Sequence, residues 1–89
     1  KDNRALLKEE IRKIDGLSLQ GPEATYLAWI DCSESGLDSP GDFFINAGVG
    51  VHKGEWFGDS NFVRLNFGCP RSRLEEALVR IKKAFSQRN

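Results

Sequence analysis

The sequence contains no methionine, only two cysteines and a single histidine among its 89 residues. Two cysteines are too few for a disulfide scaffold, and together with His52 they lack the spacing of a metal site, so we expect no bound metal and a reducing, cytoplasmic location. Charge of either sign is not in excess, because 13 basic residues balance 13 acidic ones. A neutral chain has no long-range field that attracts phosphates. We therefore expect neither nucleic acid nor a membrane surface as a partner.

Long hydrophobic runs are also missing. The longest has only a few residues, whereas a bilayer-spanning helix needs about 20. No charged and then apolar leader opens the chain. A chain of this length suits one domain with one modest core. Because it begins at Lys1 and has no methionine, we expect residues 1–89 to be a single domain of a longer protein.

Hydrophobic periodicity predicts two long helices. Apolar residues recur at i, i+4 and i+7 over residues 4–14, and Asp15–Gly16 supplies a stop signal. A second apolar stripe runs to Phe85 from a capping-box pattern at Ser72–Glu75. A short third helix is expected over residues 40–47, with Ser39 as its cap and Pro40 in its first turn.

Two segments have the composition of strands, residues 25–31 and 62–67. Both faces of the first are apolar, so we expect one to meet the helices and the other to need a layer or partner absent from these residues. Alternation in the second places Arg64 and Asn66 on the face opposite Val63 and Leu65. A brief strand is expected at residues 48–51 and a loop at 54–61. These elements predict an α+β two-layer sandwich, with a small, mostly antiparallel sheet and helices on one face.

Arg64 is the strongest functional candidate from the residues alone. A guanidinium between apolar neighbours in a strand is costly unless an anion meets it, and its planar fork fits a carboxylate. The alternative is an edge-strand arginine whose head reaches water, and the residues leave both open. Asn66 lies on the same face and suits either interpretation.

Other candidates carry weaker signals. The glycines at 48–54 miss the dinucleotide-binding spacing by one residue, and turn residues follow where a helix should begin. Trp56 and Phe57 form either an exposed contact patch or a packed loop tip. His52 has no triad partners that the sequence supports. Cys32 and Cys69 are interpreted as packing residues.

The chain resembles the C-terminal small domain of fold-type I, class I/II pyridoxal-phosphate (PLP)-dependent aminotransferases, and in particular their cystathionine β-lyase or C–S lyase (MalY/PatB) branch. The resemblance covers residues 21–85. The residues that carry it are Pro22–Asp31, Ala47–Val51 with Gly54 and Phe57–Gly58, and Phe62–Glu75.

This resemblance implies a homodimeric PLP enzyme whose large domain, absent here, carries the cofactor lysine. The small domain closes over an amino-acid substrate, and Arg64, Asn66 and Gly68 match the pattern whose arginine holds the substrate α-carboxylate. Trp56 and Phe57 match a segment that lines the substrate entrance. Neither Lys53 nor another lysine matches the cofactor-lysine context, so we expect no catalytic or cofactor-binding residue here and no activity of the chain alone.

The resemblance leaves the reaction open between C–S bond β-elimination and transamination. A third possibility is a non-catalytic, aminotransferase-like ligand-binding module of a regulator, which no residue of this chain favours. A DNA-binding segment upstream in the longer protein, in place of a lysine-bearing domain, would favour that alternative.

Overall fold

Leu7 and Ile11 lie one helical turn apart and are both fully buried, which explains helix α1 (Asn3–Arg12). The helix ends two residues before the predicted Ile14. The chain then reverses at Gly16, whose φ of +92° is left-handed and where a Cβ would lie 2.6 Å from the Cα of Ser35. Only glycine fits this turn. The computed structural model describes residues 3–20 and 26–87.

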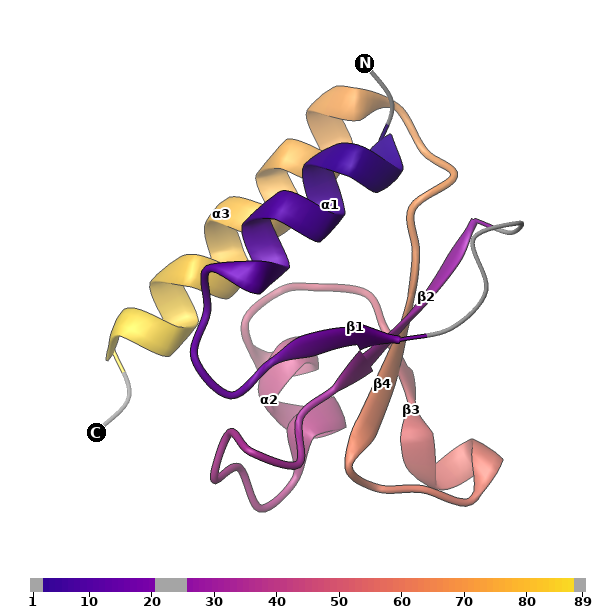
Figure 1. Cartoon of the computed structure of the whole chain (residues 1–89), viewed down its shortest axis with the longest axis vertical. Helices are drawn as coiled ribbons and strands as arrows, with labels where there is room; N and C mark the ends of the chain where they lie inside the picture. Colours follow the sequence, from indigo (N-terminus) through magenta and orange to yellow (C-terminus); the bar gives the residue numbers. More distant parts are fainter. Residues whose placement is uncertain (1–2, 21–25, 88–89) are drawn as a thin grey trace.

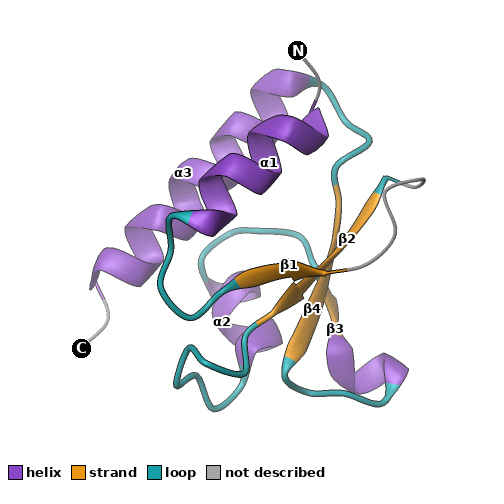
Figure 2. Ribbon diagram, in the orientation of Figure 1, coloured by secondary structure: helices purple, strands orange, loops and turns teal. Residues whose placement is uncertain are grey.

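The described strands form one antiparallel sheet (Figure 2). Its spatial order is β1 (Ser18–Gln20), β2 (Leu27–Asp31), β4 (Phe62–Asn66) and β3 (His52–Lys53). The first residue of the predicted strand over 25–31, Thr25, lies outside the described residues. The central pair, β2 and β4, places Trp29 opposite Arg64 and Ile30 opposite Val63.

Three further helical segments follow β2 in the chain: α2 (Pro40–Asn46), the 3-10 helix η1 (Gly54–Phe57) and α3 (Arg71–Gln87). Helices α1 and α3 run side by side over one face of the sheet (Figure 1). The predicted α+β architecture, with helices packed on one face, is therefore confirmed. None of the helices in the described ranges combines the length and the apolar character needed to cross a bilayer.

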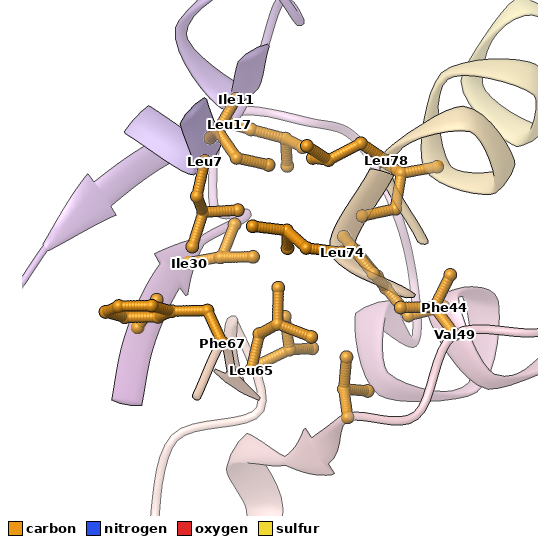
Figure 3. Close-up of a cluster of buried hydrophobic side chains, with 14 of the residues drawn as sticks. Leu7, Ile11, Leu17, Ile30, Phe44, Val49, Leu65, Phe67, Leu74 and Leu78 are labelled. Atoms are coloured by element: carbon orange, nitrogen blue, oxygen red, sulfur yellow. The ribbon is translucent and has the colours of Figure 1, made fainter. Parts of the chain in front are cut away.

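The core lies between the sheet and these helices (Figure 3). Alternate residues of the two central strands point into it, as the predicted alternation requires, and α2 contributes Phe44. The fully or almost fully buried side chains include Leu7, Ile11, Ile30, Phe44, Val63, Leu74 and Ile81. Trp29 and Arg64 lie on the opposite, outer face of the same strands.

Three local predictions are wrong. Residues 48–51 are not a strand, and β3 begins at His52; Val49 and Val51 are apolar because both are buried in the core. Residues 54–57 form η1 rather than a loop. The capping box does not open α3, which begins one residue before Ser72.

The cap of α2 also differs from expectation in one respect. Ser39 occupies the N-cap position and Pro40 the first turn, as predicted, but the Ser39 side chain makes no capping hydrogen bond. Its backbone carbonyl instead accepts the N–H of Phe43 at 3.0 Å. The helix begins here because proline already has a helical φ and has no N–H to satisfy.

An ion pair joins the two long helices: the Nζ of Lys82 on α3 contacts Oε1 of Glu10 on α1. Lys13 Nζ lies 3.3 Å from the other carboxylate oxygen of Glu10. The hydrogen bond from Lys82, the largest influence, and the contact with Lys13 lower the pKa of Glu10 below 4.5. A carboxylate with a lowered folded-state pKa stabilises the fold above its unfolded pKa and loses that contribution as the pH falls through the folded value.

Replacing Glu10 with glutamine should therefore lower the free energy of unfolding near neutral pH by about 0.5 kcal/mol, and near pH 2 the difference should vanish. Urea unfolding of the chain at both pH values measures this. Glu9→Gln is the matched control. The exposed Glu9 pairs with Arg12 and Lys13, which follow it closely in the chain, and within the described residues it forms no ion pair with α3. Equal losses at both pH values for Glu10→Gln would contradict the prediction.

Candidate functional site

Arg64 stands in a row of side chains that crosses the outer face of the sheet. Trp29 of β2 is its partner on one side and His52 of β3 on the other, while Gln20 of β1 is opposite Trp29. Cross-strand partners share a face of the sheet, so all four side chains project away from the core. The row exists because the neighbours of Arg64 in β4, Val63 and Leu65, are buried on the inner face.

Two aromatic rings contact the guanidinium of Arg64. Its Cζ lies 4.3 Å from the centroid of the Phe57 ring and 5.8 Å from that of Trp29. The two rings also contact each other edge to face, with centroids 5.3 Å apart and planes 80° apart. Both guanidinium distances are within the ~6 Å range of a cation–π interaction.

Phe57 reaches Arg64 because η1 folds tightly onto the start of β4. At Gly54, a Cβ would lie 1.9 Å from the carbonyl oxygen of Asp59 and 2.2 Å from that of Phe62. Only glycine allows this approach. At the other end of η1, Gly58 reverses the chain with a φ of +94°.

The polar contacts of Arg64 are incomplete. Its Nε is buried and has no hydrogen-bond partner, and no carboxylate among residues 3–20 and 26–87 forms an ion pair with it. A buried donor without an acceptor costs about 1–3 kcal/mol. Aromatic rings attract the positive charge, but they do not replace the in-plane acceptors that guanidinium N–H groups require. The arrangement therefore suits a planar anion with two oxygens, such as a carboxylate.

Asn66 has a structural task at the end of β4. Its side-chain Oδ1 accepts the backbone N–H of Gly68 at 2.8 Å, which forms a local turn. A Cβ at position 68 would lie 3.1 Å from the Tyr26 side chain, so glycine gives that ring room. The two-residue spacing of Asn66 and Gly68 is therefore explained by this turn. The side-chain Oδ1 of Asn66 is already used in the hydrogen bond to Gly68.

The structure separates the predicted pair Trp56 and Phe57. Phe57 lies against Arg64 and is 44% exposed, whereas Trp56 is 62% exposed and its ring centroid lies 6.1 Å from that of His52. Both rings remain partly at the surface, as the contact-patch alternative requires. Trp56 lies beside His52 at the end of the row, and Phe57 lies beside Arg64 in the candidate site.

A cleft of about 360 Å³ lies between the end of β4 and α3. Asn66 lines this cleft, but Arg64 does not. The residues that line it are Val49, Gly50, Leu65, Asn66, Gly68, Cys69, Arg73, Leu74 and Ala77. The candidate site is therefore the outer sheet face around Arg64 rather than this cleft.

Lys53 does not suit carbonyl chemistry. Its Nζ lies 2.6 Å from Oδ1 of Asp42, and this hydrogen-bonded ion pair raises the pKa of the lysine. A lysine that reacts with an aldehyde must be neutral, which a raised pKa opposes. The raised pKa of Lys53 therefore argues against a covalent bond between this lysine and an aldehyde cofactor.

Trp29 is the site residue that sequence reasoning missed. The sequence pattern predicted a strand over residues 25–31, which includes Trp29, and left open what covers its second face. It gave no indication that Trp29 lies beside Arg64. The alternation of both strands was visible, yet the register that sets Trp29 opposite Arg64 depends on tertiary pairing.

Comparisons with known proteins agree with the fold. No family model matches the chain. The cystathionine β-lyase of Corynebacterium glutamicum is 37% identical over an 84-residue alignment, which covers 91% of this chain and 23% of that protein. The solved structure of OvoB has a TM-score of 0.91 and 45% identity, covering 98% of this chain and 23% of the other.

Two further solved structures are similar to the chain. The PLP-bound C–S lyase of Staphylococcus hominis has a TM-score of 0.81 at 36% identity and covers 97% of this chain and 25% of its own. The aspartate aminotransferase of Rhizobium meliloti has a TM-score of 0.81 at 30% identity, over 96% and 24%. The predicted resemblance is confirmed. The chain is similar to one segment of PLP-dependent C–S lyases and aminotransferases, and spans 23% of the curated cystathionine β-lyase it matches.

The two cysteines are free and differ in their environment. Cys32 is 1% exposed, and burial, assisted by the charge of Asp31, raises the pKa of its thiol from 9.0 to about 12. Cys69 is partly exposed. Thiolate, not thiol, reacts with disulfide reagents, so a pKa of 12 leaves a thiolate fraction of about 10⁻⁴ at pH 8.

We expect a disulfide reagent such as Ellman's reagent to modify Cys69 readily in the folded chain, and Cys32 only after denaturation. Counting released thionitrobenzoate over time measures this at mildly alkaline pH. Cys69→Ser should remove the rapid reaction, and Cys32→Ser should leave it unchanged. Rapid reaction of both thiols in the native chain would disprove the burial argument.

Proposed function

We propose that this chain is the C-terminal small domain of a larger PLP-dependent enzyme that acts on an amino acid. In this proposal the domain closes over the substrate, and Arg64 binds the substrate α-carboxylate. The observation that carries the proposal is the guanidinium of Arg64, which contacts the neighbouring rings of Trp29 and Phe57 and has a buried Nε with no acceptor in the described residues.

A carboxylate matches this group in shape and in charge. Two parallel N–H to oxygen hydrogen bonds can form between a guanidinium and a carboxylate, and charge-assisted bonds of this kind are roughly twice as strong as neutral ones. The aromatic surroundings exclude water from part of the group, which strengthens the attraction further. Binding at one end fixes the orientation of the amino acid, and orientation is what a small closing domain contributes to the rate.

The cofactor belongs to the part of the enzyme outside this chain. PLP, when bound, acts as an electron sink for the α-carbon of an amino acid. Lys53 is not suited to react with the cofactor, since it is paired with Asp42. The chain covers 23% of the curated relative from Corynebacterium glutamicum, and we assign cofactor binding to a large domain, with a homodimer as the working assembly. On this basis the isolated chain is inactive.

The reaction we favour is β-elimination at a carbon–sulfur bond. The similarity to the cystathionine β-lyase and to the PLP-bound C–S lyase supports it, while the similarity to an aspartate aminotransferase supports transamination as the second candidate. Both reactions use the same carboxylate anchor. Pyruvate and ammonia released from cystathionine by the full-length enzyme, as opposed to oxo-acid-dependent amino transfer, decide between them.

In the full-length enzyme, Arg64→Ala should raise KM and lower kcat/KM on the order of 10²-fold or more, because a charge-assisted bidentate contact is lost. Steady-state kinetics with the amino-acid substrate measure this. Arg64→Lys keeps the charge but loses the fork and should recover only part of the loss. Arg12→Ala, which removes an exposed arginine paired with Glu9 on α1, is the control. Unchanged kinetics for Arg64→Ala would refute the anchor.

We expect the isolated 89-residue chain to form no specific, stoichiometric adduct with added PLP, because its lysines lack a cofactor-binding context. Absorbance titration followed by borohydride reduction and intact-mass measurement tests this. Heterogeneous, substoichiometric labelling of surface lysines agrees with the expectation. A single stable adduct at one lysine would show that this chain carries its own cofactor site.

A further inference from the structure

We propose that Trp29 and Phe57 are positioning residues for Arg64: their rings hold its guanidinium on the outer sheet face and, unlike an acidic residue, accept none of the in-plane N–H hydrogen bonds that a carboxylate needs. The inference rests on the proposed function, since it concerns how Arg64 is prepared for its ligand. It also changes the role expected for Phe57, from recognition of the substrate side chain to support of Arg64.

The two rings approach the guanidinium from different elements. Trp29 comes from the neighbouring strand, where the β2–β4 register places it directly opposite Arg64. Phe57 comes from η1, which tight packing at Gly54 fixes against the start of β4. The rings contact each other at 5.3 Å between centroids. A mutual contact of this kind restricts both rings, and through them the long side chain of Arg64.

Aromatic support solves a problem that an acidic partner would create. A carboxylate beside Arg64 would also hold the guanidinium, but it would accept the same N–H groups that the substrate needs. A ring face attracts the charge through its quadrupole and does not use up the in-plane donors. The Nε of Arg64, although buried, has no acceptor among the described residues, which agrees with rings rather than an acidic side chain as its neighbours.

Restriction of the Arg64 side chain before the substrate binds also favours binding. A free arginine side chain loses conformational entropy when it is fixed. If the rings already restrict it, less of this cost falls on substrate binding.

The test measures kinetics of the full-length enzyme in whichever assay it supports, elimination from cystathionine or amino transfer. Trp29→Leu and Phe57→Leu should each raise KM and lower kcat/KM about 3- to 30-fold. Trp29→Phe keeps a ring face and should recover most of the loss. Phe62→Leu is the matched control, because Phe62 packs on Trp29 at 6.4 Å between centroids and is not among the recorded ring contacts of Arg64.

A second arm repeats Trp29→Leu and Phe57→Leu in the Arg64→Ala background. If the rings act through Arg64, neither should reduce kcat/KM further there. Equal losses with and without Arg64 would overturn the inference and indicate general damage to the fold. Because Phe57 is 44% exposed, its variant keeps the test available even if Trp29→Leu fails to fold.

The outcomes also separate this inference from the proposed function. If Arg64→Ala leaves the kinetics unchanged, the proposed function fails and the inference fails with it. If Arg64→Ala is severely impaired while Trp29→Leu and Phe57→Leu behave like the Phe62→Leu control, the carboxylate anchor stands and the positioning role is wrong.

Discussion

The pairing of β2 with β4 is the constraint on which the rest of the structure depends. It sets Ala28 and Ile30 against Leu65 and Val63 on the inner face, where α1 and α3 cover them, and it sets Trp29 against Arg64 on the outer face. A shift of one residue would exchange the faces of a whole strand. The shift would expose core side chains and bury Arg64 beneath the helices, so core packing and the position of the candidate site are fixed by the same register.

The sequence was informative wherever a signal was local and periodic. Alternation in β4 placed Arg64 on the face away from the core, and the apolar stripes located α1 and α3 to within a few residues. Register was not readable, because it depends on which strands meet and on how the whole core packs. For that reason Arg64 could be selected from its strand while Trp29, its partner across the ladder, could not.

The wrong predictions have a common physical origin in tertiary packing. Val49 and Val51 have the composition of a strand, but they are apolar because the core needs them, and the backbone pairs with β4 only at the next residues. The serine at position 72 resembles a helix cap, but α3 begins one residue earlier at Arg71. The Nε of Arg71 lies 3.3 Å from Oε2 of Glu75, which is one helical turn further along α3. Local motifs of this kind identify an element more reliably than its boundary.

A balanced net charge does not prevent a local site for an anion. Several lysine and arginine side chains form ion pairs with carboxylates. These pairs include Arg12–Glu9, Lys13–Glu10, Lys53–Asp42, Arg71–Glu75, Arg80–Glu76 and Lys82–Glu10. Arg64 differs from them because its recorded contacts are aromatic rings. Each of the ion pairs neutralises its cation nearby, whereas a ring leaves the charge of Arg64 uncompensated. Arg64 therefore provides a local attraction for a carboxylate on the outer face of the sheet, although the chain as a whole carries no net charge.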